Sequence, residues 1–182
     1  EEILAFYPNC SSAPGLKGHG EQWNGHNGDG WMEFRRSEDG GLTWSAPVAL
    51  EYSKRTYDAG QGRSVMCEKA VRTADGDIVL FNLECDISKD TDWGPPWVPT
   101  FLRSGDGGRT WADPLPLGDE RGRVFDARLR GETILVLLRS KSYSLHVSTD
   151  HGRSFSRRSV LPFDAPSRCY GAMEFLPDGS LI

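Results

Sequence analysis

One eight-residue pattern occurs three times in this chain and constrains its fold more than any other feature. The copies read SEDGGLTW from Ser37 to Trp44, SGDGGRTW from Ser104 to Trp111 and STDHGRSF from Ser148 to Phe155. Each copy fits Ser-x-Asp-x-Gly-x-(Thr/Ser)-aromatic. A motif that returns at the spacing of a supersecondary unit predicts a repeat architecture before it predicts any chemistry.

The residue types in this pattern are those that build a turn. Ser and Asp side chains bond nearby backbone N–H groups, glycine adopts positive φ without penalty, and the closing aromatic can pack between sheets. A catalytic motif would not need three copies. We therefore predict a structural role for the repeated positions, which are Ser37, Asp39, Gly41, Trp44, Ser104, Asp106, Gly108, Trp111, Ser148, Asp150, Gly152 and Phe155.

The rest of the chain consists of short β-rich runs divided by Gly, Pro, Asp and Asn, and no window of about a dozen residues has the apolar spacing of a helix. Asp75-Gly76, Gly131 and Asp178-Gly179 mark three hairpins. Each motif lies between a third and a fourth run, so the repeating unit is four antiparallel strands. Radially repeated four-stranded sheets are propeller blades, and we predict an all-β partial propeller.

The repeats divide the chain into about three blades of one partial propeller domain spanning 1–182. We expect the end of one blade over about 1–50, complete blades over 63–117 and 121–161, and the start of another over 168–182. A closed propeller has roughly 4–8 blades. The unclosed sides are therefore expected to need the remaining blades, or a second copy, as a partner.

Composition excludes several classes of partner. The net charge is −5 and the lysines and arginines form no basic run, so nucleic acid is not expected. No stretch reaches the roughly 20 apolar residues of a membrane span. The histidines and acidic loops lack the spacing of metal ligands, so neither a metal nor a cofactor is expected.

The four cysteines allow three pairings, with free thiols preferred. The sequence leaves the cellular location of the protein open, and a secreted or periplasmic location is the one considered.

Blade geometry predicts where a binding site would lie. The motif turns and the first hairpin turns share one face of a propeller, so a site should use the opposite face, where first strands start and second strands end. Arginines, carboxylates and aromatics occur there, and they suit an acidic sugar. The candidate substrate-binding residues are Arg63, Arg123, Arg139, Arg168, Asp58 and Trp93. A solvated loop face is the alternative for any one of them.

The three motifs resemble the Asp boxes, or bacterial neuraminidase (BNR) repeats, of the sialidase superfamily, whose members are six-bladed propellers. The resemblance implies an exo-glycoside hydrolase that acts on terminal acidic sugars of glycans, by a retaining mechanism with a tyrosine nucleophile. Asp boxes also occur in propellers that are not sialidases. A non-catalytic propeller that binds glycans or proteins is therefore the alternative, and a purely structural repeat array is a third.

The resemblance also implies a catalytic pair. RCYGAMEFLPDGSLI resembles the family segment with the nucleophile, which gives Tyr170, and CEKAVRTADGDIVLFNLE resembles the segment with the activating glutamate, which gives Glu68. A phenol needs such a base to attack at neutral pH. Two departures stand against catalysis, because Glu84 occupies the position of a family arginine and the chain has no Arg-Ile-Pro motif. We expect the isolated chain to be inactive.

Overall fold

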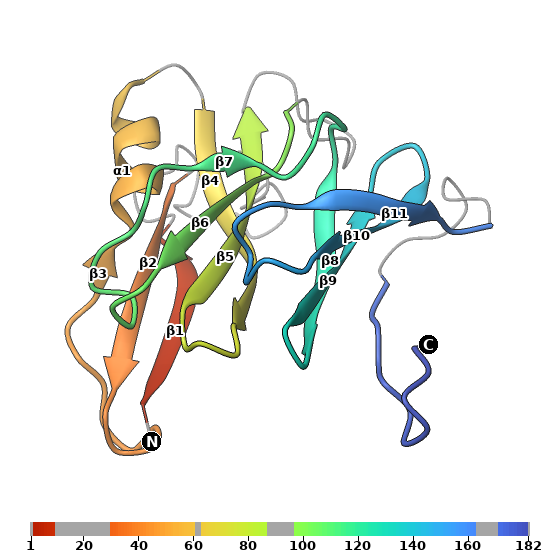
Figure 1. The fold of residues 1–182 in the computed structure, drawn as a ribbon. Helices are drawn as coiled ribbons and strands as arrows, with labels where there is room; N and C mark the ends of the chain where they lie inside the picture. The colour runs from red at the N-terminus through yellow and green to blue at the C-terminus, as the bar shows by residue number, and fades with distance from the viewer. Residues whose placement is uncertain (1, 10–29, 61–62, 87–96, 163–170, 182) are drawn as a thin grey trace. The chain divides into compact units, whose positions relative to one another are not determined.

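The computed structural model describes residues 2–9, 30–60, 63–86, 97–162 and 171–181, and apart from one short helix its regular structure is all β (Figure 1). This confirms the predicted fold class. The strands are β1 Ile3–Asn9, β2 Trp31–Ser37, β3 Val48–Ala49, β4 Arg63–Arg72, β5 Ile78–Asp86, β6 Thr100–Ser104, β7 Leu115–Pro116, β8 Arg123–Arg130, β9 Thr133–Arg139, β10 Tyr143–Ser148 and β11 Ser156–Val160.

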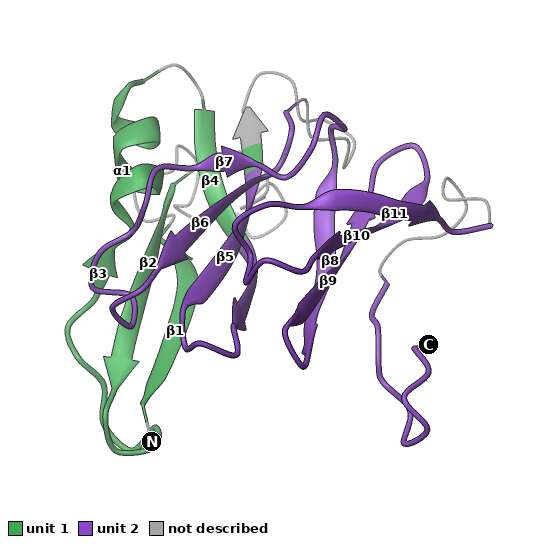
Figure 2. Cartoon of the chain, in the orientation of Figure 1, with its two compact units in different colours: residues 1–67, 84–96 green, residues 68–83, 97–182 purple. Residues whose placement is uncertain are grey.

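The strands form three sheets in which neighbours in space are also neighbours in sequence. Their orders are β1-β2-β3, β4-β5-β6-β7 and β8-β9-β10-β11. The same register recurs, because Ile3 pairs with Ser37, Ile78 with Ser104 and Ile134 with Ser148. Each motif serine therefore ends the strand before its turn, which is β2, β6 or β10, and lies opposite an isoleucine. The chain divides into two compact units, residues 1–67 with 84–96 and residues 68–83 with 97–182 (Figure 2).

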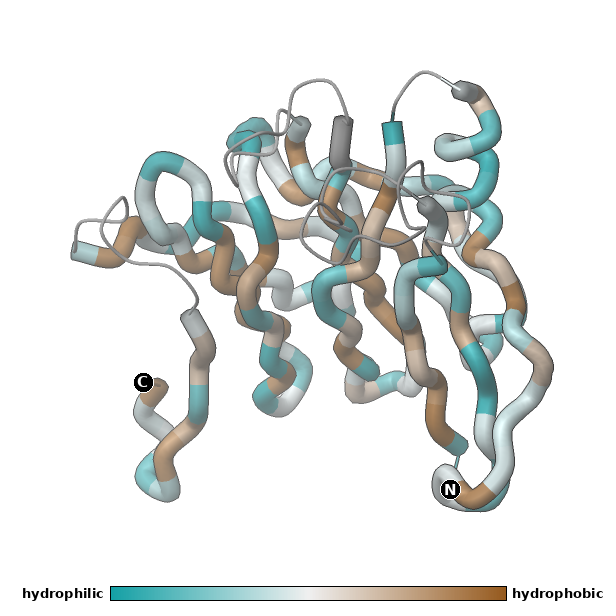
Figure 3. Tube along the Cα trace, turned by 180° about the vertical axis from the view of Figure 1, so that it is seen from behind, coloured by the Kyte–Doolittle hydropathy of each residue, from teal (hydrophilic) through white to brown (hydrophobic). Residues whose placement is uncertain are grey.

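The hydrophobic residues run along the strands (Figure 3) and bury both faces of β9 in the second unit. Ile134 and Val136 join a cluster that includes Phe81 of β5, whereas Leu135 and Leu137 join a cluster that includes Tyr143 of β10. Alternate residues of a strand point to opposite faces. A continuous apolar strand of this kind is typical of a sheet with packing on both sides.

The three motif turns make the same hydrogen bonds. The serine Oγ accepts the N–H of the motif glycine at 2.7 Å in the first two turns and 2.8 Å in the third. It also donates to the aspartate Oδ1 at 2.8, 2.8 and 2.7 Å. That Oδ1 accepts two further backbone N–H groups within each turn. The serine and aspartate side chains of each turn are thus hydrogen-bonded by residues of the same turn.

These bonds stabilise the ionised carboxylates of the turns. The side chain and N–H of Thr43, followed by Ser37, lower the pKa of Asp39 from 3.8 to about 2. The pKa of Asp106 is lowered in the same way, chiefly by Thr110. A carboxylate whose pKa is depressed in the folded state stabilises the fold above its unfolded pKa. That stability is lost as the pH falls through the folded pKa, here between 3.8 and about 2 for Asp39.

Acid is therefore expected to destabilise this chain partly through its turns. The urea midpoint should fall between about pH 5 and about pH 2, and the Asp39→Asn variant should show a shallower fall because it has lost one of the linked protons. The measurement is urea unfolding by circular dichroism across this pH range. An Asp39→Asn slope equal to that of the wild type would contradict the assignment.

The sequence shows no helical spacing and predicts no helix, which is wrong for residues 51–58. They form the helix α1, Glu51–Asp58. The buried Ser53 fixes it, because its Oγ accepts the N–H of Met32 at 2.8 Å and donates to the carbonyl of Val65 at 2.6 Å. Ser53 is also the buried residue of the helix, so no apolar stripe marked it in the sequence.

Candidate functional site

The second unit contains a buried ion pair between two of the predicted site residues. Glu68 lies on β4 and Arg123 begins β8, and the Arg123 Nη2 is 2.6 Å from the Glu68 Oε1. The side chains are 8% exposed for Arg123 and 9% for Glu68. Burial raises the pKa of Glu68, while the neighbouring Arg123 charge opposes that rise. Glu68 is therefore a shielded carboxylate that binds the guanidinium of Arg123.

The first unit contains a second buried carboxylate, at Glu84 near the end of β5. This residue is 2% exposed and its Oε2 lies 2.9 Å from the Arg63 Nη2. Its Oε1 accepts a hydrogen bond from the hydroxyl of Tyr52 on α1. The sequence analysis predicted Arg63 as a substrate ligand, and here its guanidinium binds a carboxylate of the chain itself.

Tyr52 was missed by the sequence analysis because α1 was missed. The sequence feature that indicates this helix is two pairs of opposite charges at i,i+4 spacing, which are Glu51 with Arg55 and Lys54 with Asp58. That spacing is typical of a helix and would have indicated a regular position for Tyr52. Asp58, a predicted substrate ligand, lies in the last turn of α1 with its side chain 55% exposed and 2.5 Å from Lys54.

Two of the candidate arginines are brought together by the sheet. Arg139 ends β9 and is the cross-strand partner of Arg123 at the start of β8. Its Nε is buried without a hydrogen-bond partner, and no ion pair is found for its guanidinium among the described residues. The structure therefore places Arg123 and Arg139 side by side, at the same end of the neighbouring strands β8 and β9. The remaining candidates, Arg168, Trp93 and the proposed nucleophile Tyr170, lie outside the described residues.

The described residues contain no cluster of three or more His, Cys, Asp or Glu side chains arranged to hold a metal ion. None of the helical structure described is long and apolar enough to cross a membrane.

Comparison with known proteins gives the class of fold. No family model and no curated protein matches the sequence. Solved sialidase structures do match, and the chain has a sialidase-like fold. The Hadza microbial sialidase Hz136 aligns with a TM-score of 0.54 at 16% identity, over 86% of this chain and 30% of that one. Trypanosoma rangeli sialidase in complex with 2,3-difluorosialic acid aligns with a TM-score of 0.51 at 15% identity, over 86% and 25%.

A leech intramolecular trans-sialidase also matches, with a TM-score of 0.50 at 16% identity, over 73% of this chain and 19% of that one. The chain thus spans less than a third of the length of each of these proteins. That partial coverage fits a partial propeller, as the sequence predicts. Structural matches at this level of identity establish the fold alone, so any chemistry has to be argued from the residues of this chain.

Proposed function

We propose that this chain belongs to a sialidase-like exo-glycoside hydrolase that acts on terminal acidic sugars of glycans. The observation that supports this most is the buried Glu68–Arg123 pair in a chain with a sialidase-like fold. Shielded carboxylates with a specific charged partner occur preferentially at functional sites. Glu68 is also the residue to which the resemblance assigns the activating role.

In the proposed reaction, Glu68 accepts the phenolic proton of Tyr170 as the Tyr170 oxygen attacks the anomeric carbon. The bond from that carbon to the glycan oxygen breaks, and the glycan oxygen takes a proton from an acid that we leave unassigned. Water then hydrolyses the glycosyl–tyrosine bond, so that the configuration is retained. The charge of Arg123 opposes the rise that burial gives the pKa of Glu68, and so favours the ionised form that a base needs.

The sugar carboxylate requires a cation that is not already neutralised. Arg63 and Arg123 each bind a carboxylate of this chain, whereas no such partner is found for Arg139 among the described residues. We therefore propose Arg139, together with Arg168, as the carboxylate ligands. A planar guanidinium binds a carboxylate through two parallel hydrogen bonds.

A second candidate function is non-catalytic binding of glycans or proteins, and Glu84 favours it. The resemblance places an arginine at this position, and a buried carboxylate there binds Arg63. A carboxylate at that position would repel an acidic sugar. Without that arginine the chain could retain binding through other side chains while lacking turnover.

The test is release of a fluorogenic leaving group from a sialoside, measured on this chain and on any longer natural form of it. Tyr170→Phe and Glu68→Gln should each lower kcat/KM by about 100-fold or more, the scale of a lost nucleophile or general base. The matched controls are Tyr7→Phe, which removes a hydroxyl bonded to Arg35, and Glu174→Gln at an exposed carboxylate. Both should retain wild-type turnover. Sialoside binding without turnover in any form would favour the second candidate.

A further inference from the structure

The turn from Ser148 to Phe155 shows how a motif turn packs against the sheet before it. The Phe155 ring lies 5.4 Å from the Phe81 ring and 5.0 Å from the Phe101 ring, edge-on to both. A Cβ atom at position 152 would lie 2.5 Å from Val79 and 3.2 Å from Ile134. The motif glycine is therefore held between these two side chains, with the motif aromatic beside them.

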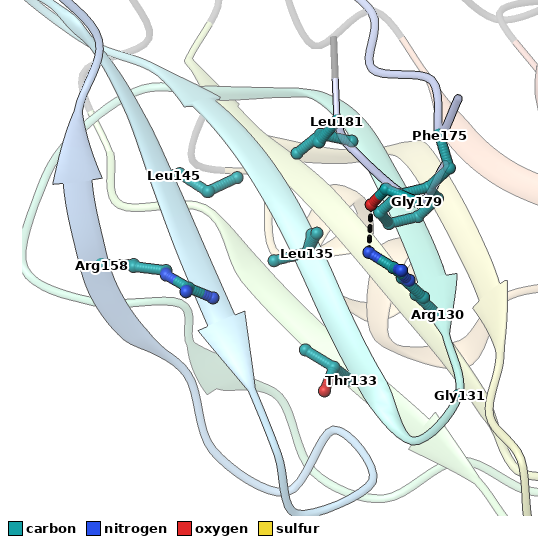
Figure 4. A pocket seen from close by; sticks show the side chains of 9 residues that line it. All are labelled: Arg130, Gly131, Thr133, Leu135, Leu145, Arg158, Phe175, Gly179 and Leu181. Carbon is teal, nitrogen blue, oxygen red and sulfur yellow. Dashed lines mark hydrogen bonds between the residues drawn. The ribbon is translucent and has the colours of Figure 1, made fainter. Parts of the chain in front are cut away.

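A pocket on the other side of the β8–β11 sheet contains counterparts of these groups. It is a cavity of about 740 Å³ whose lining includes Leu135, Leu145 and Leu181 (Figure 4). Because Ile78 and Ile134 occupy equivalent register positions, Leu135 corresponds to Val79. By the same register Leu145 corresponds to Phe101, since each lies on the third strand opposite equivalent residues of the second.

Leu181 completes the correspondence. The hairpin before it makes the bonds Leu176 N–H to Ser180 O and Gly179 N–H to Leu176 O. These repeat the bonds Thr73 N–H to Asp77 O and Gly76 N–H to Thr73 O in the hairpin before Ile78. Leu181 is thus equivalent to Ile78 and, through the shared register, to Ile134. The pocket is thus lined by equivalents of three of the four side chains that receive Gly152 and Phe155, namely those of Val79, Phe101 and Ile134.

The first motif turn has the shape to fill such a pocket. Trp44 is 40% exposed and Leu42 is 84% exposed. A Cβ atom at position 41 would lie 3.7 Å from Ile3, the register equivalent of Ile134, and the other atom found within 4 Å belongs to Trp44. Gly41 therefore has one of the two neighbours that hold Gly152, and within the described residues no counterpart of Val79 contacts it.

Charge also matches between the first turn and the pocket. The turn contains Glu38 and Asp39 and no cation. The pocket lining contains Arg130 and Arg158 and no acidic residue, and Figure 4 shows these guanidinium groups on either side of the leucines. Complementary charges of this kind steer association and fix its orientation.

We propose that the Ser37–Trp44 turn of one copy of this chain inserts into the Leu135–Leu145–Leu181 pocket of a second copy. The turn and the pocket are different surfaces of each copy, so the contact is head-to-tail. In this contact Trp44 of one copy lies against Leu145 of the other, as Phe155 lies against Phe101, the counterpart of Leu145. Glu38 then lies near Arg158, which is exposed at the pocket.

The test is the mass of the 182-residue chain in solution, measured by sedimentation over a wide range of concentration. We expect reversible self-association, and Trp44→Ala should raise the dissociation constant by about tenfold or more, as truncation of a central aromatic does. Glu38→Lys and Arg158→Glu should each weaken association, and the variant with both changes should recover it. Both sites are exposed, so these variants should fold.

The control is Glu51→Lys on α1, an exposed charge reversal that should leave the association unchanged. A chain that is monomeric at every concentration would overturn the proposal. Self-association that is unaffected by Trp44→Ala, or a charge exchange that does not restore binding, would also overturn it, because the contact would then use another surface.

Discussion

Gly152→Ala is expected to lower the free energy of unfolding by about 2–5 kcal/mol, which adds the cost of a left-handed non-glycine residue to that of overpacking a core. Gly152 has a φ of 76°, and its new methyl group would lie 2.5 Å from Val79. Val79 is itself fully buried and has little room to move. Urea unfolding of the variant beside the wild type measures the loss.

Gly40→Ala is the matched control for this prediction. Gly40 has a φ of 75°, nearly that of Gly152, but no atom of the described part of the chain lies within 4 Å of the position of its Cβ. Its substitution should therefore cost only the backbone strain, about 1–2 kcal/mol. Equal losses for the two variants would show that contact with Val79 contributes nothing.

Arg123→Leu is the second substitution with a large expected effect. It leaves Glu68 buried without its cation, and breaking a buried pair from one side costs about 3–5 kcal/mol. Burial then raises the pKa of Glu68 above its unfolded value, with the charge of Lys69 left to oppose that rise. A raised carboxylate pKa destabilises the fold above the unfolded pKa of 4.5 and not below it. The loss should therefore be larger at neutral pH than in acid, as urea unfolding at both would show.

Two comparisons make this prediction specific to the pair. The double variant Arg123→Leu with Glu68→Leu should recover much of the lost stability, because no charge remains buried. Arg157→Leu removes an arginine that is 55% exposed and paired with Glu120. It should cost at most about 1 kcal/mol, as exposed ion pairs do. A double variant as unstable as the single one would contradict this account of Glu68.

The sheets could be predicted from sequence because local chemistry specifies them. Asp-Gly turns and the Ser-x-Asp-x-Gly motif define the connections, and the motif serines close β2, β6 and β10 where each strand ends. The helix α1 could not be predicted in this way. Its stability depends on the contacts of Ser53 with Met32 and Val65, which belong to other elements. Tertiary packing of this kind overrides a weak local preference.

The residues of the candidate site could be predicted from the sequence, but the hydrogen-bond and ion-pair partners of their side chains could not. Glu68 and Arg123 were both singled out, but their ion pair joins positions 55 apart in sequence. The bond from Tyr52 to Glu84 spans 32 positions. No local sequence pattern shows which cation will pair with a given carboxylate far away in the sequence, because the pairing depends on how the strands and the helix are placed. The sequence analysis therefore assigned to a substrate the arginines that here bind carboxylates of the chain.

The hydrogen bonds of the motif turns also have a consequence for how the chain folds. In each turn the serine and aspartate contacts join residues at most four positions apart. Closing so short a loop costs little chain entropy, and contacts between near neighbours form early. Each turn can therefore bring together the two strands that flank it without the other repeats. We expect three independent starting points for folding, with the long-range ion pairs forming after them.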